Sequence, residues 1–150
     1  MSDLRSLYQE MIVDHGRAPR NFGVLEAATH CREGHNPLCG DQVTLYVDEA
    51  AGVIRALRFQ GKGCAISMAS ASLMTEALEG KTVAEAEKVF ADFHWLVTEK
   101  EHPAELEETL GKLAAFKNLS EFPVRVKCAT LAWHTLRAAL AEDDKLVSTE

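Results

Sequence analysis

Residues 43–59 read VTLYVDEAAGVIRALRF, and this stretch decides the fold class. Apolar residues alternate with other residues over 43–47, which is the period of a β-strand. The polar segment 48–52 predicts a turn, and the apolar, β-branched segment 53–59 predicts the returning strand of a hairpin. With a further strand expected at residues 24–32, we predict a three-stranded antiparallel sheet.

Helical patterns lie on both sides of this hairpin. Before it, apolar residues recur on one face of residues 4–15, and Gly16 ends this helix. After it, a helix rich in Ala and Ser begins near Cys64 and ends at Gly80, and its small side chains would allow close approach to the sheet. Further helices are predicted to begin near Thr82, Pro103 and Pro123. One α+β domain over residues 1–150, a three-stranded antiparallel sheet packed by several helices, accounts for the chain.

The bulk composition excludes several classes of protein. The chain has 47% hydrophobic and 26% charged residues, the balance of a soluble globular domain, and we expect Trp95 and Trp133 in its core. Its net charge of −7 argues against nucleic-acid or anionic-membrane binding, because both depend on basic patches. No apolar run approaches the roughly 18 residues of a membrane span, and the N-terminus lacks the apolar stretch of a signal peptide. We therefore expect a cytoplasmic protein with no nucleic-acid or membrane partner.

The chain contains four cysteines, Cys31, Cys39, Cys64 and Cys128. In a reducing cytosol, cysteines bind metals, react or fill the core more often than they form disulfides. Cys31 lies beside His30, but neighbours in a strand point to opposite faces. This geometry argues against a second metal site that includes both His30 and Cys31.

Cys39 lies in the segment NPLCGD, which comprises residues 36–41. Pro37 and Gly40 predict a turn. A strand that starts near Asp41 would place Cys39 and Asp41 on the same side. A thiolate and a carboxylate would then point to one place.

Cys64 and Cys128 lie where positive charge favours the thiolate, the form that binds metals and attacks sulfur. Cys64 follows Gly-Lys-Gly at a strand-to-helix junction, where a helix N-terminus carries partial positive charge. Cys128 follows Arg125 and Lys127 early in the last predicted helix. We therefore expect both positions to favour the thiolate.

Three thiolates and one carboxylate form a ligand set that suits tetrahedral Zn²⁺, and thiolates also hold iron–sulfur clusters. However, 24 and 63 residues lie between Cys39, Cys64 and Cys128, which is not the spacing of a zinc finger. Cysteines scattered in this way are structural at least as often as they are ligands. The spacing alone therefore leaves both roles open.

The segments around the cysteines carry more information than their spacing. They are DH at 14–15, PRNFG at 19–23, NPLCGD at 36–41, GKGCAIS at 61–67, ASASLM at 69–74 and RVKCATLAW at 125–133. Together, over residues 3–140, they resemble the SufU branch of the IscU/NifU-type iron–sulfur cluster assembly proteins. IscU-type members carry a histidine where this chain has Lys127, and they lack the extra helical stretch at 91–110. Both features resemble SufU.

The resemblance implies an IscU-like fold and a zinc site whose ligands are Cys39, Asp41, Cys64 and Cys128. The family places no ligand at Cys31, which is therefore expected to be a buried structural cysteine. It also implies that Cys39 accepts sulfur as a persulfide from a pyridoxal-phosphate-dependent cysteine desulfurase. Arg125 and Lys127 are expected to contact that partner electrostatically. Apo iron–sulfur proteins or a downstream scaffold would then receive the sulfur or the cluster.

Two mechanisms compete within this interpretation. In the first, a zinc-dependent sulfurtransferase carries persulfide sulfur. In the second, a scaffold transiently holds a 2Fe–2S or 4Fe–4S cluster and passes it to apo-proteins. Lys127 in place of histidine favours the first. A structural zinc-binding interaction module is the alternative of another class, and the aspartate speaks against it because structural zinc sites use cysteine and histidine.

Overall fold

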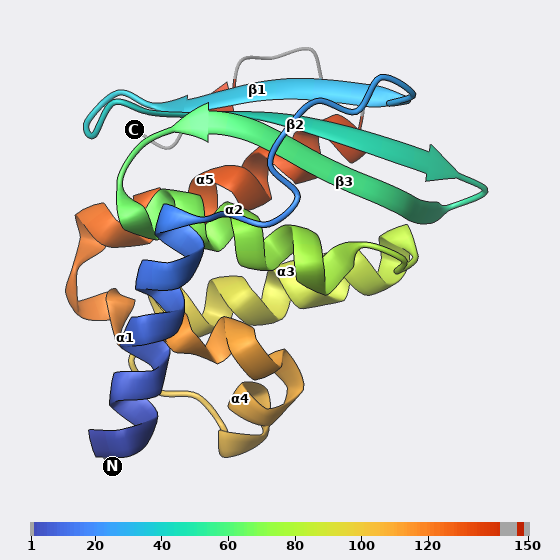
Figure 1. Cartoon of the computed structure of the whole chain (residues 1–150). Helices are drawn as coiled ribbons and strands as arrows, with labels where there is room; N and C mark the ends of the chain where they lie inside the picture. The colour runs from blue at the N-terminus through green and yellow to red at the C-terminus, as the bar shows by residue number, and fades with distance from the viewer. Residues whose placement is uncertain (1, 142–146, 149–150) are drawn as a thin grey trace.

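The predicted hairpin is the centre of the sheet in this computed structural model, which describes residues 2–141 and 147–148 (Figure 1). Strands β2 (Asp41–Ala50) and β3 (Val53–Lys62) pair antiparallel. Strand β1 (His30–Asn36) pairs antiparallel with the other edge of β2. The predicted three-stranded antiparallel sheet is therefore confirmed.

Two features of the sheet differ from the sequence-based expectation. β1 begins at His30, although the sequence predicts a strand at 24–32. Its inward positions include Gly34, because the last helix passes so close that a Cβ atom there would overlap Thr135. Such a strand has no apolar alternation to mark it. In addition, a two-residue strand β4 (Val147–Ser148) pairs parallel with β1, so the order is β3-β2-β1-β4.

The helices lie on one face of the sheet (Figure 1). Helices α2 and α5 pack against the strands, α1 packs along α2, and α3 and α4 lie further from the sheet. Their bounds are α1 Ser2–Arg17, α2 Ala65–Leu78, α3 Val83–Thr98, α4 Ala104–Leu110 and α5 Pro123–Leu140, with 3-10 helices at Gly111–Phe116 and Leu119–Glu121. The helix predicted to begin near Thr82 is confirmed as α3, and it opens with a capping box in which Thr82 and Glu85 exchange both hydrogen bonds.

The core contains one of the two tryptophans. Trp133 is buried and stacks on Phe93, with ring centroids 4.5 Å apart. Trp95 is 41% exposed, so its predicted core position is wrong. The reason is helical geometry, because a residue two positions after buried Phe93 points to the opposite side of α3.

The small side chains of α2 allow close approach by its neighbours. A Cβ atom on Gly16 of α1 would lie 3.1 Å from the carbonyl oxygen of Ala65. On the α5 side, the indole N–H of Trp133 donates to Ser70 Oγ at 3.0 Å. Helix α2 is therefore held firmly on two sides, which fixes the position of its N-terminus.

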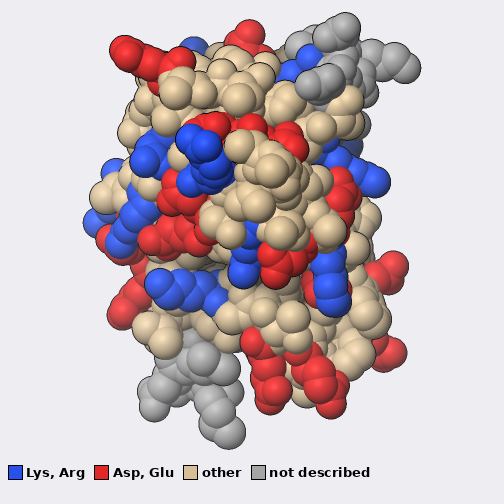
Figure 2. Space-filling model, turned by 90° about the vertical axis from the view of Figure 1, so that its right-hand side faces the viewer, with Lys and Arg blue, Asp and Glu red and all other residues tan. Residues whose placement is uncertain are grey.

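One face of the molecule carries charges of both signs. Figure 2 views the end of the molecule that carries the β2–β3 turn, and acidic and basic side chains are interspersed on this face. Within the described ranges, none of the helices combines the length and the apolar character needed to cross a bilayer.

Candidate metal centre

Four segments meet at one end of the sheet, and each carries one predicted ligand. Cys39 lies in the loop between β1 and β2, and Asp41 is the first residue of β2. Cys64 is the N-cap of α2, and Cys128 lies in the second turn of α5. We call these four residues the thiol cluster.

Distances within the thiol cluster suit a single metal ion. Cys128 Sγ lies 3.4 Å from Cys39 Sγ, and Cys64 Sγ lies 3.9 Å from Asp41 Oδ2. Ligand atoms of Cys39, Asp41 and Cys128 all lie within 4.8 Å of one another, and among the described residues this is the one such group of three. A tetrahedral zinc ion with bonds of about 2.0–2.3 Å separates its ligand atoms by about 3.3–3.8 Å. Cys39, Asp41 and Cys128 therefore offer a donor set that fits zinc, while Cys64 lies outside this group of three and contacts it at Asp41.

Asn36, the last residue of β1, holds the loop that carries Cys39. Its carbonyl accepts hydrogen bonds from the N–H groups of Cys39, at 3.3 Å, and Gly40, at 2.8 Å. Its side-chain Oδ1 accepts the N–H of Leu38 at 3.2 Å. Gly40 has a φ of 74°, a conformation that favours glycine. This tight turn leaves Cys39 exposed at the surface.

Asp41 is fully buried, and its two carboxylate oxygens have different surroundings. Oδ1 accepts the backbone N–H of Cys64 at 2.9 Å, whereas Oδ2 faces the Cys64 sulfur. Gly63 packs against the carboxylate so closely that a Cβ atom there would overlap Oδ1. The backbone thus holds one oxygen and leaves the other for a metal.

Cys64 begins α2, as the sequence predicts. Its Sγ accepts the backbone N–H of Ser67 at 3.4 Å, which caps the helix. The capped sulfur is held beside the Asp41 carboxylate, so the helix start and the strand start contribute neighbouring ligand atoms.

Cys128 is the buried cysteine of the cluster, and burial raises the pKa of its thiol. Hydrogen bonds with neighbouring cluster side chains raise this pKa further. The prediction that Arg125 and Lys127 favour the Cys128 thiolate is therefore wrong, since burial dominates. The Arg125 guanidinium instead lies at the surface over the Phe122 ring, 4.8 Å from its centroid. A metal that binds Cys128 must displace its proton.

Cys31 lies apart from the thiol cluster. Its side chain is exposed, so the prediction of a buried cysteine is wrong. Partial desolvation and the neighbouring Glu33 carboxylate raise the pKa of its thiol. His30 points to the opposite face of β1, as predicted, and its Nε2 lies 3.0 Å from Glu49 Oε1.

Exposed apolar side chains lie next to Cys39 in the chain and at the start of the helix that carries Cys128. Leu38 precedes Cys39, while Phe122 and Val124 open α5; all three are about half exposed or more. Arg125 is exposed beside them, and Lys127 is half-buried. The predicted contacts of Arg125 and Lys127 with a partner stay a prediction.

Sequence reasoning assigns no role to Asn36 or Gly63, although both contact the thiol cluster. The Asn-Pro pair is a signal for Asn36, because an asparagine before a turn often bonds the backbone two residues on. Gly63 gives no such signal. Its requirement is for space beside Asp41, which only the folded chain reveals.

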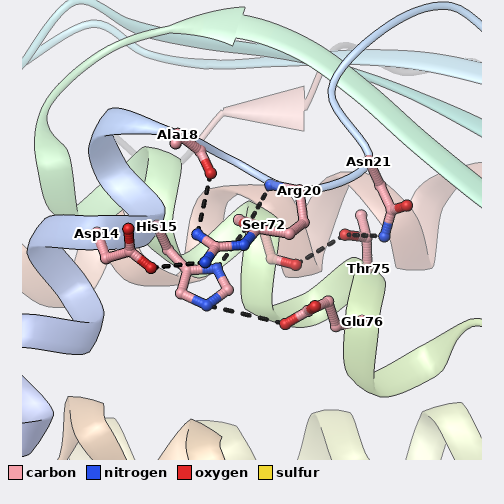
Figure 3. A network of polar contacts seen from close by, with 8 residues as sticks. All are labelled: Asp14, His15, Ala18, Arg20, Asn21, Ser72, Thr75 and Glu76. Carbon is pink, nitrogen blue, oxygen red and sulfur yellow. Dashed lines mark hydrogen bonds and ion pairs between the residues drawn. The ribbon is translucent and has the colours of Figure 1, made fainter.

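A second polar cluster lies further along α2 (Figure 3). We call it the α1–α2 cluster, and it comprises His15, Arg20, Ser72, Thr75 and Glu76. His15 is 4% exposed and places Nδ1 2.7 Å from Ser72 Oγ, so it is a buried part of the contact between α1 and α2. The backbone N–H of Arg20 donates to the same oxygen at 2.8 Å, and Thr75 donates to the Ser72 carbonyl at 2.7 Å. Burial and the Arg20 charge lower the pKa of His15.

Known proteins resemble the chain over nearly its whole length. Residues 7–146 match the family described as the NifU-like N terminal domain. The zinc-dependent sulfurtransferase SufU of Bacillus subtilis is 38% identical over 146 residues, covering 95% of this chain and 95% of that protein. The iron–sulfur cluster assembly scaffold protein IscU of Streptococcus pyogenes is 37% identical over 140 residues, covering 93% and 86%.

A solved structure has the same fold. It is that of a candidate iron–sulfur cluster assembly scaffold protein for the SUF system from Fervidobacterium islandicum AW-1, with a TM-score of 0.81 and 38% identity. The similarity covers 91% of this chain and 98% of that one. The chain therefore belongs to the NifU-like N-terminal domain family, which confirms its resemblance to the SufU and IscU proteins of iron–sulfur cluster assembly.

Proposed function

We propose that this protein accepts persulfide sulfur on Cys39 from a cysteine desulfurase and that it does so at a zinc site, in iron–sulfur cluster assembly. The observation that carries the proposal is an exposed thiol, Cys39, 3.4 Å from the sulfur of buried Cys128, within a donor set that fits zinc. The name of the Bacillus relative, a zinc-dependent sulfurtransferase, supports the same function.

Zinc would be held by Cys39, Asp41, Cys64 and Cys128. When bound, it would keep the thiols deprotonated and protected until the partner arrives. The chain itself decides which ligand can leave. Asp41 and Cys128 are buried. Cys39 and Cys64 are both exposed, but Cys39 lies on a surface loop, whereas the Cys64 sulfur caps a packed helix.

The transfer step follows from ordinary persulfide chemistry. The Cys39 thiolate attacks the outer sulfur of the desulfurase cysteine persulfide. A new sulfur–sulfur bond forms on Cys39, the bond within the donor persulfide breaks, and the desulfurase cysteine leaves as a thiolate. Cys39 then carries the persulfide, and no external oxidant or reductant is needed for this step.

The partner would dock beside Cys39. Leu38 next to Cys39, and Phe122 and Val124 at the start of α5, offer exposed apolar surface, and Arg125 and Lys127 add positive charge to a chain that is acidic overall. A pyridoxal-phosphate-dependent cysteine desulfurase is the proposed donor. Apo iron–sulfur proteins or a downstream scaffold are the proposed recipients.

The decisive experiment mixes the zinc-loaded protein with the cysteine desulfurase of the same organism and with cysteine. Trapped persulfide is located by mass spectrometry, and desulfurase turnover is measured with a reductant present. We expect persulfide and higher turnover with wild type and Cys31→Ala, and neither with Cys39→Ala. Cys128→Ser keeps the acceptor thiol but lacks a ligand, so it separates sulfur acceptance from zinc binding. A zinc-loaded wild type that gains no persulfide and leaves turnover unchanged would refute the proposal.

A scaffold is the second candidate, because three thiols in one cluster also suit an iron–sulfur cluster and the Streptococcus relative is named a scaffold. In that case, anaerobic iron and sulfide should produce a stable visible chromophore. That chromophore should transfer to an apo-ferredoxin faster than free iron and sulfide do. Efficient transfer, together with unchanged desulfurase turnover, would favour the scaffold over the sulfurtransferase.

A further inference from the structure

Asn36 is a fully buried polar side chain at the edge of the thiol cluster, and it is not itself one of the four ligands. Its side-chain Oδ1 accepts the N–H of Leu38 at 3.2 Å. Its Nδ2 points to Cys128 Sγ, 3.9 Å away. The two ends of one amide therefore connect the loop of Cys39 to the sulfur on α5.

The orientation of this amide follows from its partners. The Leu38 N–H needs an acceptor, which only the oxygen end of the amide provides. The NH₂ end must then face Cys128. At 3.9 Å the contact is long for the sulfur of a buried thiol, but an ionised sulfur is a much stronger acceptor for an N–H group.

The donor matters because Cys128 is buried and has little access to water. A thiolate there has negative charge that must be stabilised by metal and by hydrogen bonds. The Asn36 N–H reaches this sulfur from the side of β1. It can withdraw electron density from the sulfur and hold it in place for a metal.

We propose that Asn36 is a positioning residue of the zinc site. It fixes the Cys39 loop through Oδ1 and donates through Nδ2 to the Cys128 thiolate, so that zinc is held more tightly and released more slowly. This inference rests on the proposed function, in which zinc is bound by the thiol cluster.

Two substitutions separate the role of Asn36 as a hydrogen-bond donor to Cys128 from its role in holding the loop of Cys39. Asn36→Asp keeps the shape and the oxygen for the Leu38 N–H but replaces the NH₂ group with a second oxygen. Asn36→Ser keeps a short acceptor for the loop but is too short to reach Cys128, and it places no charge in the core. Asn21→Asp is the matched control, because the Asn21 amide donates to Thr75 Oγ1 at 3.1 Å in the α1–α2 cluster, away from the proposed zinc ligands.

The test measures zinc affinity by chelator competition and the thiolate-to-metal charge-transfer band of the cobalt-substituted protein. We expect about 10-fold or greater loss of zinc affinity in both Asn36 variants, the usual effect of losing a partner of a metal ligand. The cobalt band should move to longer wavelength, because the sulfur becomes more electron-rich. Asn21→Asp should match wild type in both measurements.

The cobalt band distinguishes this role from a merely structural one, since a weakened loop would not shift it. Wild-type affinity and an unshifted band in Asn36→Ser would overturn the inference while leaving the zinc site intact. Equal losses in Asn21→Asp would also overturn it, because the effect would then be general. A wild-type protein that binds neither zinc nor cobalt would refute the proposed function itself.

Discussion

The two polar clusters along α2 each combine buried and exposed side chains, but they differ in how their hydrogen-bonding groups are satisfied. In the α1–α2 cluster, donors meet acceptors of the same chain: Ser72 Oγ contacts His15 Nδ1 and accepts the N–H of Arg20. In the thiol cluster, sulfur and carboxylate atoms face one another, and all of them become acceptors when ionised. A complete network indicates structural stabilisation. A concentration of acceptors with few donors indicates a cation.

The largest effect is expected from substitutions that remove a ligand from the thiol cluster. Wild-type protein should be purified with about one zinc per chain, because three thiolates and a carboxylate complete a tetrahedron. Cys39→Ala, Cys64→Ala and Cys128→Ala should each lose this zinc, as measured by elemental analysis. Ser72→Ala in the α1–α2 cluster and Cys31→Ala should keep it. Full zinc content in two of the three cluster variants would contradict the site.

Removing the metal should destabilise the wild-type protein, because zinc binds the folded state in preference to the unfolded one. At free zinc 1,000-fold above its Kd, the linked stabilisation is about 4 kcal/mol, or a melting temperature about 10 °C higher. Calorimetry with and without a chelator measures this difference. Cys128→Ser serves as the control and should not respond to the chelator. An unchanged wild-type melting curve after confirmed zinc loss would count against a stabilising site.

The α1–α2 cluster should respond to Ser72→Ala in stability rather than in zinc content. The substitution leaves the Arg20 N–H and buried His15 without their partner, which costs about 1–3 kcal/mol. Urea unfolding of the zinc-stripped protein measures the loss. Ser6→Ala, an exposed position on α1, should be nearly neutral. A Ser72→Ala variant as stable as wild type would show that this network contributes little.

The smallest expected effect is a pH dependence from the same cluster. Burial and Arg20 hold the pKa of His15 below its ordinary value of 6.5, so the unfolded chain takes up the proton first. Stability is therefore full above pH 6.5 and falls as the pH drops below that value, by at most about 1.4 kcal/mol per pH unit. His15→Gln should flatten this slope in urea unfolding between pH 5 and 7.5. His134, whose pKa burial also lowers, should give a separate and additive slope.

Much of the fold could be predicted, because its elements obey simple periods. The hairpin of β2 and β3 alternates regularly, and the helix starts carry caps or prolines. β1 could not be placed, since its inward Gly34 and Asn36 reflect the closeness of α5 and a polar turn rather than an apolar face. The position of such a strand is determined by tertiary contacts, so no local sequence pattern predicts it.

Only part of the candidate site could be predicted from the sequence. Segment resemblance, rather than spacing, brought Cys39 together with Cys128, which lies 89 positions later in the chain. The direction of the Cys128 pKa could not be predicted, because neighbouring cations are visible in a sequence and burial is not. The contact of Asn36 with the Cys128 sulfur could not be predicted either, because the two residues lie 92 positions apart in the chain.

Two glycines lie next to Asp41, Gly40 in the chain and Gly63 in space, and they would respond to mutation for different reasons. Gly40 has open space around its missing side chain but a φ of 74°, so a mutational scan should tolerate asparagine there better than valine. Gly63 has no such conformational demand, yet even a methyl group would collide with the Asp41 carboxylate. A scan at position 63 should therefore exclude side chains according to their size, and the result would measure the space beside one oxygen of the Asp41 carboxylate.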